Sequence, residues 1–237
     1  MYEIDATNVS LFACIIPPPD GIPARGIVVD FHGLGSGTEM RDSSPTGVSY
    51  AESGAIYVYP YYGPWSWMND VAVQYCDSVL SAVIQRFHLS AETAVVATGG
   101  SMGGLSALVF ARYSRLRIVA CAANCPVCDL PRHYTERPDL PRTLHVAFGH
   151  YACPLQAAFK SASPLHLAAS MPRIPYYIVH GDADAAVNKK LHSDRLVAEL
   201  RRLGYDVTYD EVPGMPHCAL PPRNGDAFRA FILEHMG

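Results

Sequence analysis

Short runs of apolar, mostly β-branched residues recur along the chain and predict six buried strands. Nearly every position in the first five runs is apolar, which is typical of parallel strands that are covered on both faces. The last run alternates between apolar and polar residues, as an edge strand does. The runs span residues 25–33, 54–60, 93–100, 116–124, 174–182 and 205–212.

Helical patterns fall between these strands. Apolar residues at helical spacing predict helices over 69–87, 101–114, 188–204 and 226–237, and a shorter one over 43–54. Asn69 is a predicted N-cap, Gly204 a predicted C-cap, and Pro45 suits a first helical turn. The alternation of strands and helices predicts an α/β domain with a parallel sheet.

Two regions depart from this alternation. Residues 2–24 suggest one or two antiparallel strands, with Pro17, Pro18, Pro19 and Gly21 forming the turn. Residues 125–170 are rich in Pro and His and contain no clear strand, so we predict an insertion over the edge of the sheet. Since no repeat or linker interrupts the pattern, we expect a single domain over residues 1–237.

Composition agrees with a folded, water-soluble chain. Of 237 residues, 49% are hydrophobic and 17% charged, and the net charge of −4 lacks the basic footprint of a nucleic-acid partner. No run of about 18 apolar residues predicts a membrane span. The opening residues MYEIDATNVS lack the features of a signal peptide, which predicts a cytoplasmic protein unless a leader has been removed.

Ser101 lies in the stretch GGSMG, which matches the G-x-S-x-G pattern. The stretch comes directly after a predicted strand and before a predicted helix. A tight strand-to-helix turn of this kind lifts a serine hydroxyl above the sheet and aims the next amide, that of Met102, at a developing oxyanion. A glycine-rich turn can also bind phosphate, but neither a G-x-G-x-x-G nor a P-loop pattern is present.

A carboxylate and a histidine follow in the order that nucleophilic catalysis requires. The stretch HGDADAAV follows the fifth strand and GMPHCAL follows the sixth, so that His217 lies 33 residues after Asp184. A serine needs a histidine to accept its proton and a carboxylate to orient that histidine. Asp182 and Asp184 are both candidates for the carboxylate. The order Ser, Asp, His is the order found in α/β-hydrolases.

Together these stretches resemble the α/β-hydrolase superfamily, and within it the serine esterases of the prolyl-oligopeptidase-like and dienelactone-hydrolase-like branch. The resemblance rests on DFHGLGSG (30–37), TGGSMGG (98–104), YYIVHGDADAAV (176–187) and GMPHCAL (214–220), and runs from about residue 25 to the end. It implies a mostly parallel sheet with helices on both faces. It also implies Ser101 as nucleophile, His217 as base and Asp184 rather than Asp182 as acid.

The stretch HGLGSG predicts the second donor of the oxyanion hole. Its glycines let backbone amides approach a carbonyl oxygen closely, and Gly33, Leu34 and Gly35 are the candidates, with Leu34 preferred. His32 is expected to pack beneath this loop. His145, His150 and His166 have no evident partner, and His180 is expected to make a structural hydrogen bond. No histidine or cysteine spacing indicates a metal site, and no cofactor is predicted.

An aromatic segment, residues 57–70, holds four tyrosines and both tryptophans. Tyr62, Trp65 and Trp67 follow the second strand at the edge where α/β sheets bind ligands, so they are candidate substrate-binding residues. The alternative is a loop anchored by buried aromatic rings. The seven cysteines are expected to be mostly buried thiols, with one disulfide within 121–128 as the alternative.

The sequence therefore predicts a serine carboxylesterase that works through an acyl-enzyme. The resemblance to acetyl xylan and feruloyl esterases favours acetyl or hydroxycinnamoyl esters of plant carbohydrate as substrates. Two alternatives stay open: a prolyl-oligopeptidase-like peptidase, and an inactive hydrolase fold that only binds a ligand. The expected partner is a small-molecule or carbohydrate ester, and the oligomeric state is not predicted.

Overall fold

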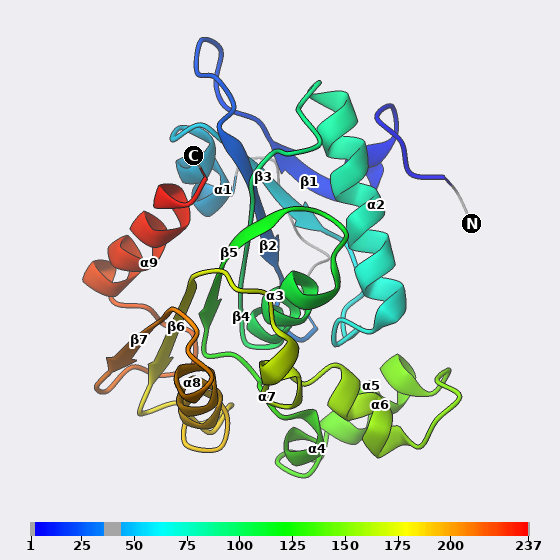
Figure 1. Cartoon of the computed structure of the whole chain (residues 1–237), viewed down its shortest axis with the longest axis vertical. Helices are drawn as coiled ribbons and strands as arrows, with labels where there is room; N and C mark the ends of the chain where they lie inside the picture. Colours follow the sequence, from blue (N-terminus) through cyan, green and yellow to red (C-terminus); the bar gives the residue numbers. More distant parts are fainter. Residues whose placement is uncertain (1–2, 36–43, 237) are drawn as a thin grey trace.

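Seven strands form one sheet in the order β1-β3-β2-β4-β5-β6-β7 (Figure 1). The computed structural model describes residues 3–35 and 44–236. The strands are β1 (Ala13–Ile16), β2 (Gly26–Phe31), β3 (Ala55–Pro60), β4 (Val95–Gly100), β5 (Ile118–Asn124), β6 (Tyr176–Gly181) and β7 (Val207–Val212). All neighbouring strands pair in parallel except β1 and β3, which are antiparallel.

Helices cover both faces of this sheet. The helices are α1 (Pro45–Ala51), α2 (Asp70–Arg86), α3 (Met102–Tyr113), α4 (Leu130–His133), α5 (Leu140–Phe148), α6 (Leu155–Ser161), α7 (Pro164–Leu167), α8 (Ser193–Arg202) and α9 (Pro222–Glu234). Two short 3-10 turns, Val9–Leu11 and Ala168–Ser170, complete the described elements. The architecture is the α/β-hydrolase fold that the pattern and the resemblance predict.

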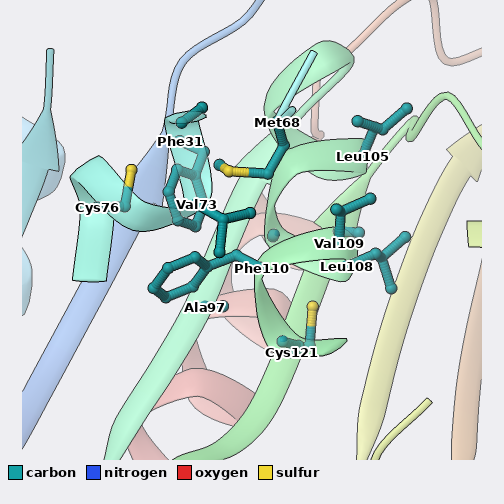
Figure 2. Close-up of a cluster of buried hydrophobic side chains, with 14 of the residues drawn as sticks. Phe31, Met68, Val73, Cys76, Ala97, Leu105, Leu108, Val109, Phe110 and Cys121 are labelled. Atoms are coloured by element: carbon teal, nitrogen blue, oxygen red, sulfur yellow. The ribbon is translucent and has the colours of Figure 1, made fainter. Parts of the chain in front are cut away.

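Two apolar cores lie on opposite faces of the sheet. On one face, side chains of β2 and β4 pack against α2 and α3, as Figure 2 shows for Phe31, Val73 and Phe110, and side chains of α8 belong to the same core. On the other face, Val28 and Val96 belong to a smaller core that includes side chains of α1 and α9. Burial on both faces is the reason why the inner strands are apolar at most positions.

The six predicted strands are all present, but three details differ. The strand β1 pairs with β3 rather than with β2, so the proline turn connects strands that are not neighbours. The helix α8 begins at Ser193, because residues 188–192 form turns that bury His192. The helix α9 begins at Pro222, four residues earlier than predicted, because a proline is well placed at a first helical position.

Helices α4 to α7 lie between β5 and β6, in the lower part of Figure 1. The segment of residues 125–170 contains no strand, as its sequence predicts. This segment matters for the site because it begins at the carboxyl end of β5, which lies between the ends of β4 and β6. Among the described helices, none is long and apolar enough to cross a membrane.

Candidate active site

Ser101 lies at the turn between β4 and α3 in a conformation that L-residues rarely adopt. Its backbone has φ 61° and ψ −123°, and its amide donates a hydrogen bond of 2.9 Å to the carbonyl oxygen of Asn124 on β5. A non-glycine residue at such dihedrals costs on the order of 1–3 kcal/mol and persists only where its surroundings fix it. The local strain is that of the sharp strand-to-helix turn expected around Ser101.

Gly103 is required by the close approach of α3 to β2. A Cβ at this position would lie only 1.9 Å from the carbonyl oxygen of Phe31, which is a backbone atom and cannot move aside easily. The glycines around Ser101 therefore serve packing, since they let the first turn of α3 lie directly against the end of β2.

Asp184 and His217 are joined directly. Nδ1 of His217 lies 2.6 Å from Oδ2 of Asp184, whose side chain is fully buried. Oδ1 of Asp184 accepts the amides of Ala186 and Val187 at 2.8 and 2.9 Å. These bonds hold the carboxylate in one orientation, and the carboxylate in turn fixes the imidazole with Nε2 free to act as a base.

His180 is a further member of this network that the sequence did not assign to it. Its Nε2 lies 3.1 Å from Oδ2 of Asp184 and its Nδ1 lies 2.6 Å from Oγ of Ser193. Asp182 plays a different part, because its Oδ1 accepts the amide of Gly214 at 2.6 Å and so links the two loops that follow β6 and β7. The four-residue spacing between His180, at the end of β6, and Asp184, on the loop that follows, is a signal that could have identified the contact.

The loops that carry Asp184 and His217 meet closely. A Cβ at Gly181 would lie 1.9 Å from the carbonyl oxygen of Met215, so only glycine allows the loop after β7 to approach the end of β6. Ser101, Asp184 and His217 thus follow the carboxyl ends of β4, β6 and β7. These strands are neighbours in the sheet, except that β5 lies between β4 and β6.

The serine hydroxyl and the imidazole are not hydrogen-bonded in the described chain. Nε2 of His217 lies 3.7 Å from Sγ of Cys218, and that sulfur lies 3.7 Å from the carbonyl oxygen of Asn124, which also accepts the amide of Ser101. The imidazole is thereby placed near the turn that carries Ser101. Catalytic hydrogen bonds are often long in hydrolases without a substrate.

Electrostatics at His217 favour the charged imidazolium. Burial lowers the pKa of His217, but the hydrogen bond to Asp184 and the contact with Cys125 outweigh this effect and raise the pKa to about 9. Burial raises the pKa of Asp184. Its hydrogen bonds to His180, His217 and two amides have a larger and opposite effect, so the net pKa lies well below the usual range. Asp184 is therefore an anion at any working pH.

The predicted oxyanion donors separate into two groups. The amide of Gly35 donates to the carbonyl oxygen of Pro64 at 2.7 Å, so this amide is already engaged and the preference for Leu34 over Gly35 stays a prediction. Within the described residues, the amides of Gly33, Leu34 and Met102 have no hydrogen-bond acceptor. A Cβ built on Gly33 would lie 4.0 Å from Cβ of Ser101, which places this loop beside the serine.

The aromatic segment is mostly an anchor. Trp67 is 1% exposed and donates from Nε1 to Oγ1 of Thr143, while Tyr62 is 6% exposed and its hydroxyl donates to the carbonyl oxygen of His32. This burial corrects the interpretation of Tyr62 and Trp67 as ligand-stacking rings. Trp65 is only partly buried. It follows Pro64, whose carbonyl oxygen holds Gly35, so Trp65 lies next to the loop of candidate oxyanion donors.

Other histidines take structural positions. His32 is buried beneath its loop, with Nδ1 2.8 Å from the carbonyl oxygen of Gly33. The three histidines that the sequence left without partners each have one: His145 contacts the hydroxyl of Tyr134, His150 contacts Asp70, and His166 lies 3.4 Å from Asp129. The contact of His150 joins residues 125–170 to α2, and the other two lie within that segment.

A cavity of about 370 Å³ opens at the imidazole. Its walls are His217, Pro216, Arg137 and three alanines of the acid loop, Ala183, Ala185 and Ala186. Larger cavities lie elsewhere, including one of about 620 Å³ against Asp77 and Tyr113 on α2 and α3. All seven cysteines are free thiols, so no disulfide closes the 121–128 segment.

The fold and the site define the class of this chain. A mostly parallel sheet, a strained serine turn after β4, and a His–Asp pair on the loops after β6 and β7 are the features of an α/β-hydrolase.

Comparison with protein families gives a match to the prolyl oligopeptidase family over residues 67–236. The chain belongs to this family, and the match supports a serine hydrolase. A search of curated proteins gave no match.

Among solved structures, the chain is similar to the acylaminoacyl peptidase of Pyrococcus horikoshii, with a TM-score of 0.75, 16% identity, and coverage of 92% of this chain and 38% of that one. It is similar to an esterase of Thermogutta terrifontis, with a TM-score of 0.65, 21% identity, and coverage of 94% and 85%. It is also similar to esterase PE8, with a TM-score of 0.65, 19% identity, and coverage of 93% and 97%. The chain thus spans less than two fifths of the peptidase, and these likenesses show the fold.

Proposed function

We propose that this protein is a serine hydrolase that cleaves carboxylic esters through an acyl-enzyme. The observation that carries the proposal is the 2.6 Å hydrogen bond between Asp184 and His217, at the sheet edge where Ser101 is held at φ 61°. Ser101 is the proposed nucleophile, His217 the general base and Asp184 the residue that orients the base.

The chemistry follows from the protonation states of these groups. Neutral His217 accepts the proton of the Ser101 hydroxyl through Nε2, while the oxygen of Ser101 attacks the ester carbonyl. The amides of Met102 and Leu34 then donate to the carbonyl oxygen as it becomes negatively charged. The imidazolium, stabilised by Asp184, gives its proton to the departing alcohol. Water repeats the sequence on the acyl-enzyme and releases the acid.

The substrate class proposed is an acetyl or hydroxycinnamoyl ester, including esters of carbohydrate. The three alanine side chains that line part of the cavity at His217 are compatible with both acyl groups. With Tyr62 and Trp67 buried, Trp65 is the remaining candidate of the three for stacking on a flat ring. We therefore expect Trp65→Ala to reduce the rate with a feruloyl ester much more than the rate with an acetyl ester.

The test compares esters of increasing acyl size. Initial rates are measured with acetyl, butyryl, octanoyl and feruloyl esters and with acetylated xylan, for the wild type and Ser101→Ala. Ser101→Ala should lose activity by a factor on the order of 10⁶, the scale seen when a catalytic serine is removed. A fluorophosphonate probe should label Ser101 in the wild type. An unlabelled serine together with no turnover would instead indicate an inactive fold that only binds a ligand.

A second candidate activity is peptide hydrolysis. It is favoured by the match to the prolyl oligopeptidase family and by the similarity to a structure named as an acylaminoacyl peptidase. The same active site serves both reactions, because an amine can leave in place of an alcohol once it is protonated by His217. Acylaminoacyl and aminoacyl amides assayed beside the esters decide between them by the ratio of kcat/KM.

A further inference from the structure

Two cysteines converge on the imidazole that the proposed mechanism needs. Cys125 follows the end of β5 and Cys218 follows His217 in the chain, 93 residues away. The two sulfurs and a ring nitrogen of His217 all lie within 4.8 Å of one another. Sγ of Cys218 is 3.7 Å from Nε2 of His217, and the amide of Cys218 lies 3.5 Å from Sγ of Cys125.

We propose that Cys125, Cys218 and Nε2 of His217 form a binding site for a soft divalent cation, Zn²⁺ above all, and that an ion bound there switches off hydrolysis. The inference rests on the proposed function only for its consequence, since the ion would occupy the lone pair that accepts the proton of Ser101. The binding itself depends on the three ligands alone.

The distances suit tetrahedral zinc. Zinc binds thiolate sulfur at about 2.3 Å and imidazole nitrogen at about 2.1 Å, so tetrahedral angles place sulfur and nitrogen about 3.6 Å apart and two sulfurs about 3.8 Å apart. The observed separation of 3.7 Å between Sγ of Cys218 and Nε2 of His217 matches the first value. The two separations that involve Sγ of Cys125, to Sγ of Cys218 and to the ring nitrogen, are at most 4.8 Å. Each must therefore shorten by at most about 1 Å to reach the zinc values, and rotation of a thiol side chain supplies that movement.

The outer contacts of the histidine are also those of a metal ligand. Zinc-binding histidines commonly donate their second ring nitrogen to a carboxylate, which fixes the ring and strengthens the ligand. Nδ1 of His217 makes this contact with Oδ2 of Asp184, which is itself held by His180 and two amides. The ring of His217 is therefore already fixed, with Nε2 directed toward Sγ of Cys218.

The two cysteines are held in place by backbone contacts. Cys125 has φ 45° and Cys218 has φ 56°. The amide of Cys125 donates to the carbonyl oxygen of Val179 at 2.8 Å, and the side-chain amide of Asn124 donates to the carbonyl oxygen of Cys218 at 3.3 Å. Both thiols are therefore presented from fixed positions. On binding, each thiol that is still protonated and Nε2 of the imidazolium release their protons to solvent, because thiolate and neutral imidazole are the ligands.

Another cluster with a metal-like composition, His133, Glu136 and His192, does not have the same capacity. Nδ1 of His192 accepts the amides of Cys128 and Asp129 at 3.0 and 3.3 Å, so its proton lies on Nε2, which faces Glu136 at 3.0 Å. Ligation through Nε2 would remove the only ring proton of His192, because two amide donors keep a proton off Nδ1, whereas His217 keeps its Nδ1 proton toward Asp184. This cluster is a hydrogen-bonded network.

The binding test measures the metal directly. Purified protein, kept reduced with a non-thiol phosphine and stripped with a chelator, is titrated with Co²⁺ and, in equilibrium dialysis, with Zn²⁺. We expect one ion per chain and a thiolate-to-cobalt charge-transfer band in the near ultraviolet. Cys125→Ser and Cys218→Ser should each weaken Zn²⁺ binding at least about 100-fold, since even outer contacts of metal ligands contribute 10–100-fold. Cys153→Ser is the matched control, because Cys153 is exposed and distant in the chain.

The activity test is separate. The rate of ester hydrolysis by the wild type should fall as Zn²⁺ is added and should return with chelator. In both cysteine variants, the rate with Zn²⁺ divided by the rate without it should approach one. If either variant fails to fold, protection of Cys218 from alkylation by Zn²⁺ in the wild type, read by mass spectrometry, gives the same answer, because Cys218 is the partly exposed thiol of the pair. Equal inhibition of the wild type and the variants, or absence of the cobalt band, would overturn the proposal. A protein that binds Zn²⁺ at these cysteines but hydrolyses no ester would contradict the proposed function and leave the metal site standing.

Discussion

At the scale of single residues, Asp184 is the most constrained side chain of the site. It is fully buried and accepts from two imidazoles and two amides, so all of its acceptor sites are used. Asp182, two residues earlier, is exposed and accepts one amide of the neighbouring loop. The same residue type thus serves chemistry at one position and loop structure at the other.

The paired substitutions Asp184→Asn and Asp182→Asn test this division. In Asp184→Asn the side-chain amide presents a donor toward His217, which favours the wrong tautomer, so kcat/KM should fall about 10⁴-fold. In Asp182→Asn the oxygen that accepts the amide of Gly214 is retained, and kcat/KM should change little. Steady-state kinetics with an acetyl ester measure both, and a larger loss in Asp182→Asn would reverse the assignment of the acid.

The pKa of His217 predicts an alkaline rate profile. The base must be neutral, and its pKa is raised to about 9, so kcat/KM should rise with pH until about that value. The contact with Cys125 contributes to the raised pKa of His217, and Cys125→Ser replaces the ionisable thiol in that contact with a hydroxyl. The midpoint of the pH–rate profile should therefore move to lower pH in Cys125→Ser and stay in place in Cys153→Ser. An unchanged midpoint in Cys125→Ser would show that Asp184 alone sets the pKa.

At the scale of elements, the unit that matters is β4, the serine turn and α3 packed against β2. The first turn of α3 touches the backbone of β2, and the strain at Ser101 is maintained by this packing. Stability and nucleophile geometry therefore depend on the same glycine.

Gly103→Ala should accordingly unfold or severely destabilise the protein. The new methyl group would lie 1.9 Å from the carbonyl oxygen of Phe31, and relief of that contact requires α3 to move away from the sheet. We expect a loss of more than about 4 kcal/mol in the free energy of unfolding. Gly225→Ala in α9 is the matched control, because its Cβ has no neighbour closer than 4.0 Å and alanine should stabilise the helix by about 0.5–1 kcal/mol. Chemical denaturation measures both values.

At the scale of the whole molecule, the segment between β5 and β6 is tied to the loop before α8. Oε2 of Glu136 lies 2.7 Å from Nδ1 of His133 and 3.0 Å from Nε2 of His192, and both histidines are buried. The ring of His133 also contacts Trp67 edge to face. One carboxylate thus connects α4 with the loop before α8, next to the aromatic segment.

Glu136→Ala should loosen this connection. Two buried imidazole donors would lose their acceptor, at about 1–3 kcal/mol for each unsatisfied group. The melting temperature should fall, and hydrogen exchange should increase in residues 125–170 and around His192. Glu199→Ala is the control, since Glu199 forms an ion pair with Arg202 on the surface of α8 and such pairs contribute little. Equal effects of the two substitutions would contradict a connecting role for Glu136.

Sequence patterning was most informative where the environment of a segment is uniform. The inner strands are covered on both faces, so most of their positions are apolar and the runs are easily recognised. The turn around Ser101 was also evident, because its glycines form a short motif between a strand and a helix, although the contact that requires Gly103 is with Phe31 on β2. The prediction that residues 125–170 are an insertion stays a prediction, although their helices lie where it places them.

Sequence reasoning was weaker where a role depends on distant partners. Trp67 and Tyr62 look like exposed loop aromatics until Thr143 and His32 are seen to bind their polar atoms. The amide of Gly35 looked free until the carbonyl oxygen of Pro64 was placed beside it. In each case the partner comes from a segment whose position only the sheet order determines.

The sequence by itself determined the class of fold, the serine turn, and the order of serine, carboxylate and histidine, because each is encoded in local periodicity or in a short spaced motif. The tertiary structure alone decided which aromatic rings are buried, which amides stay free, and that Cys125 and Cys218 meet at His217. The physical reason is that these contacts join strand ends that are far apart in the chain, and side-chain distances across a sheet follow from strand order and register, which no local pattern contains.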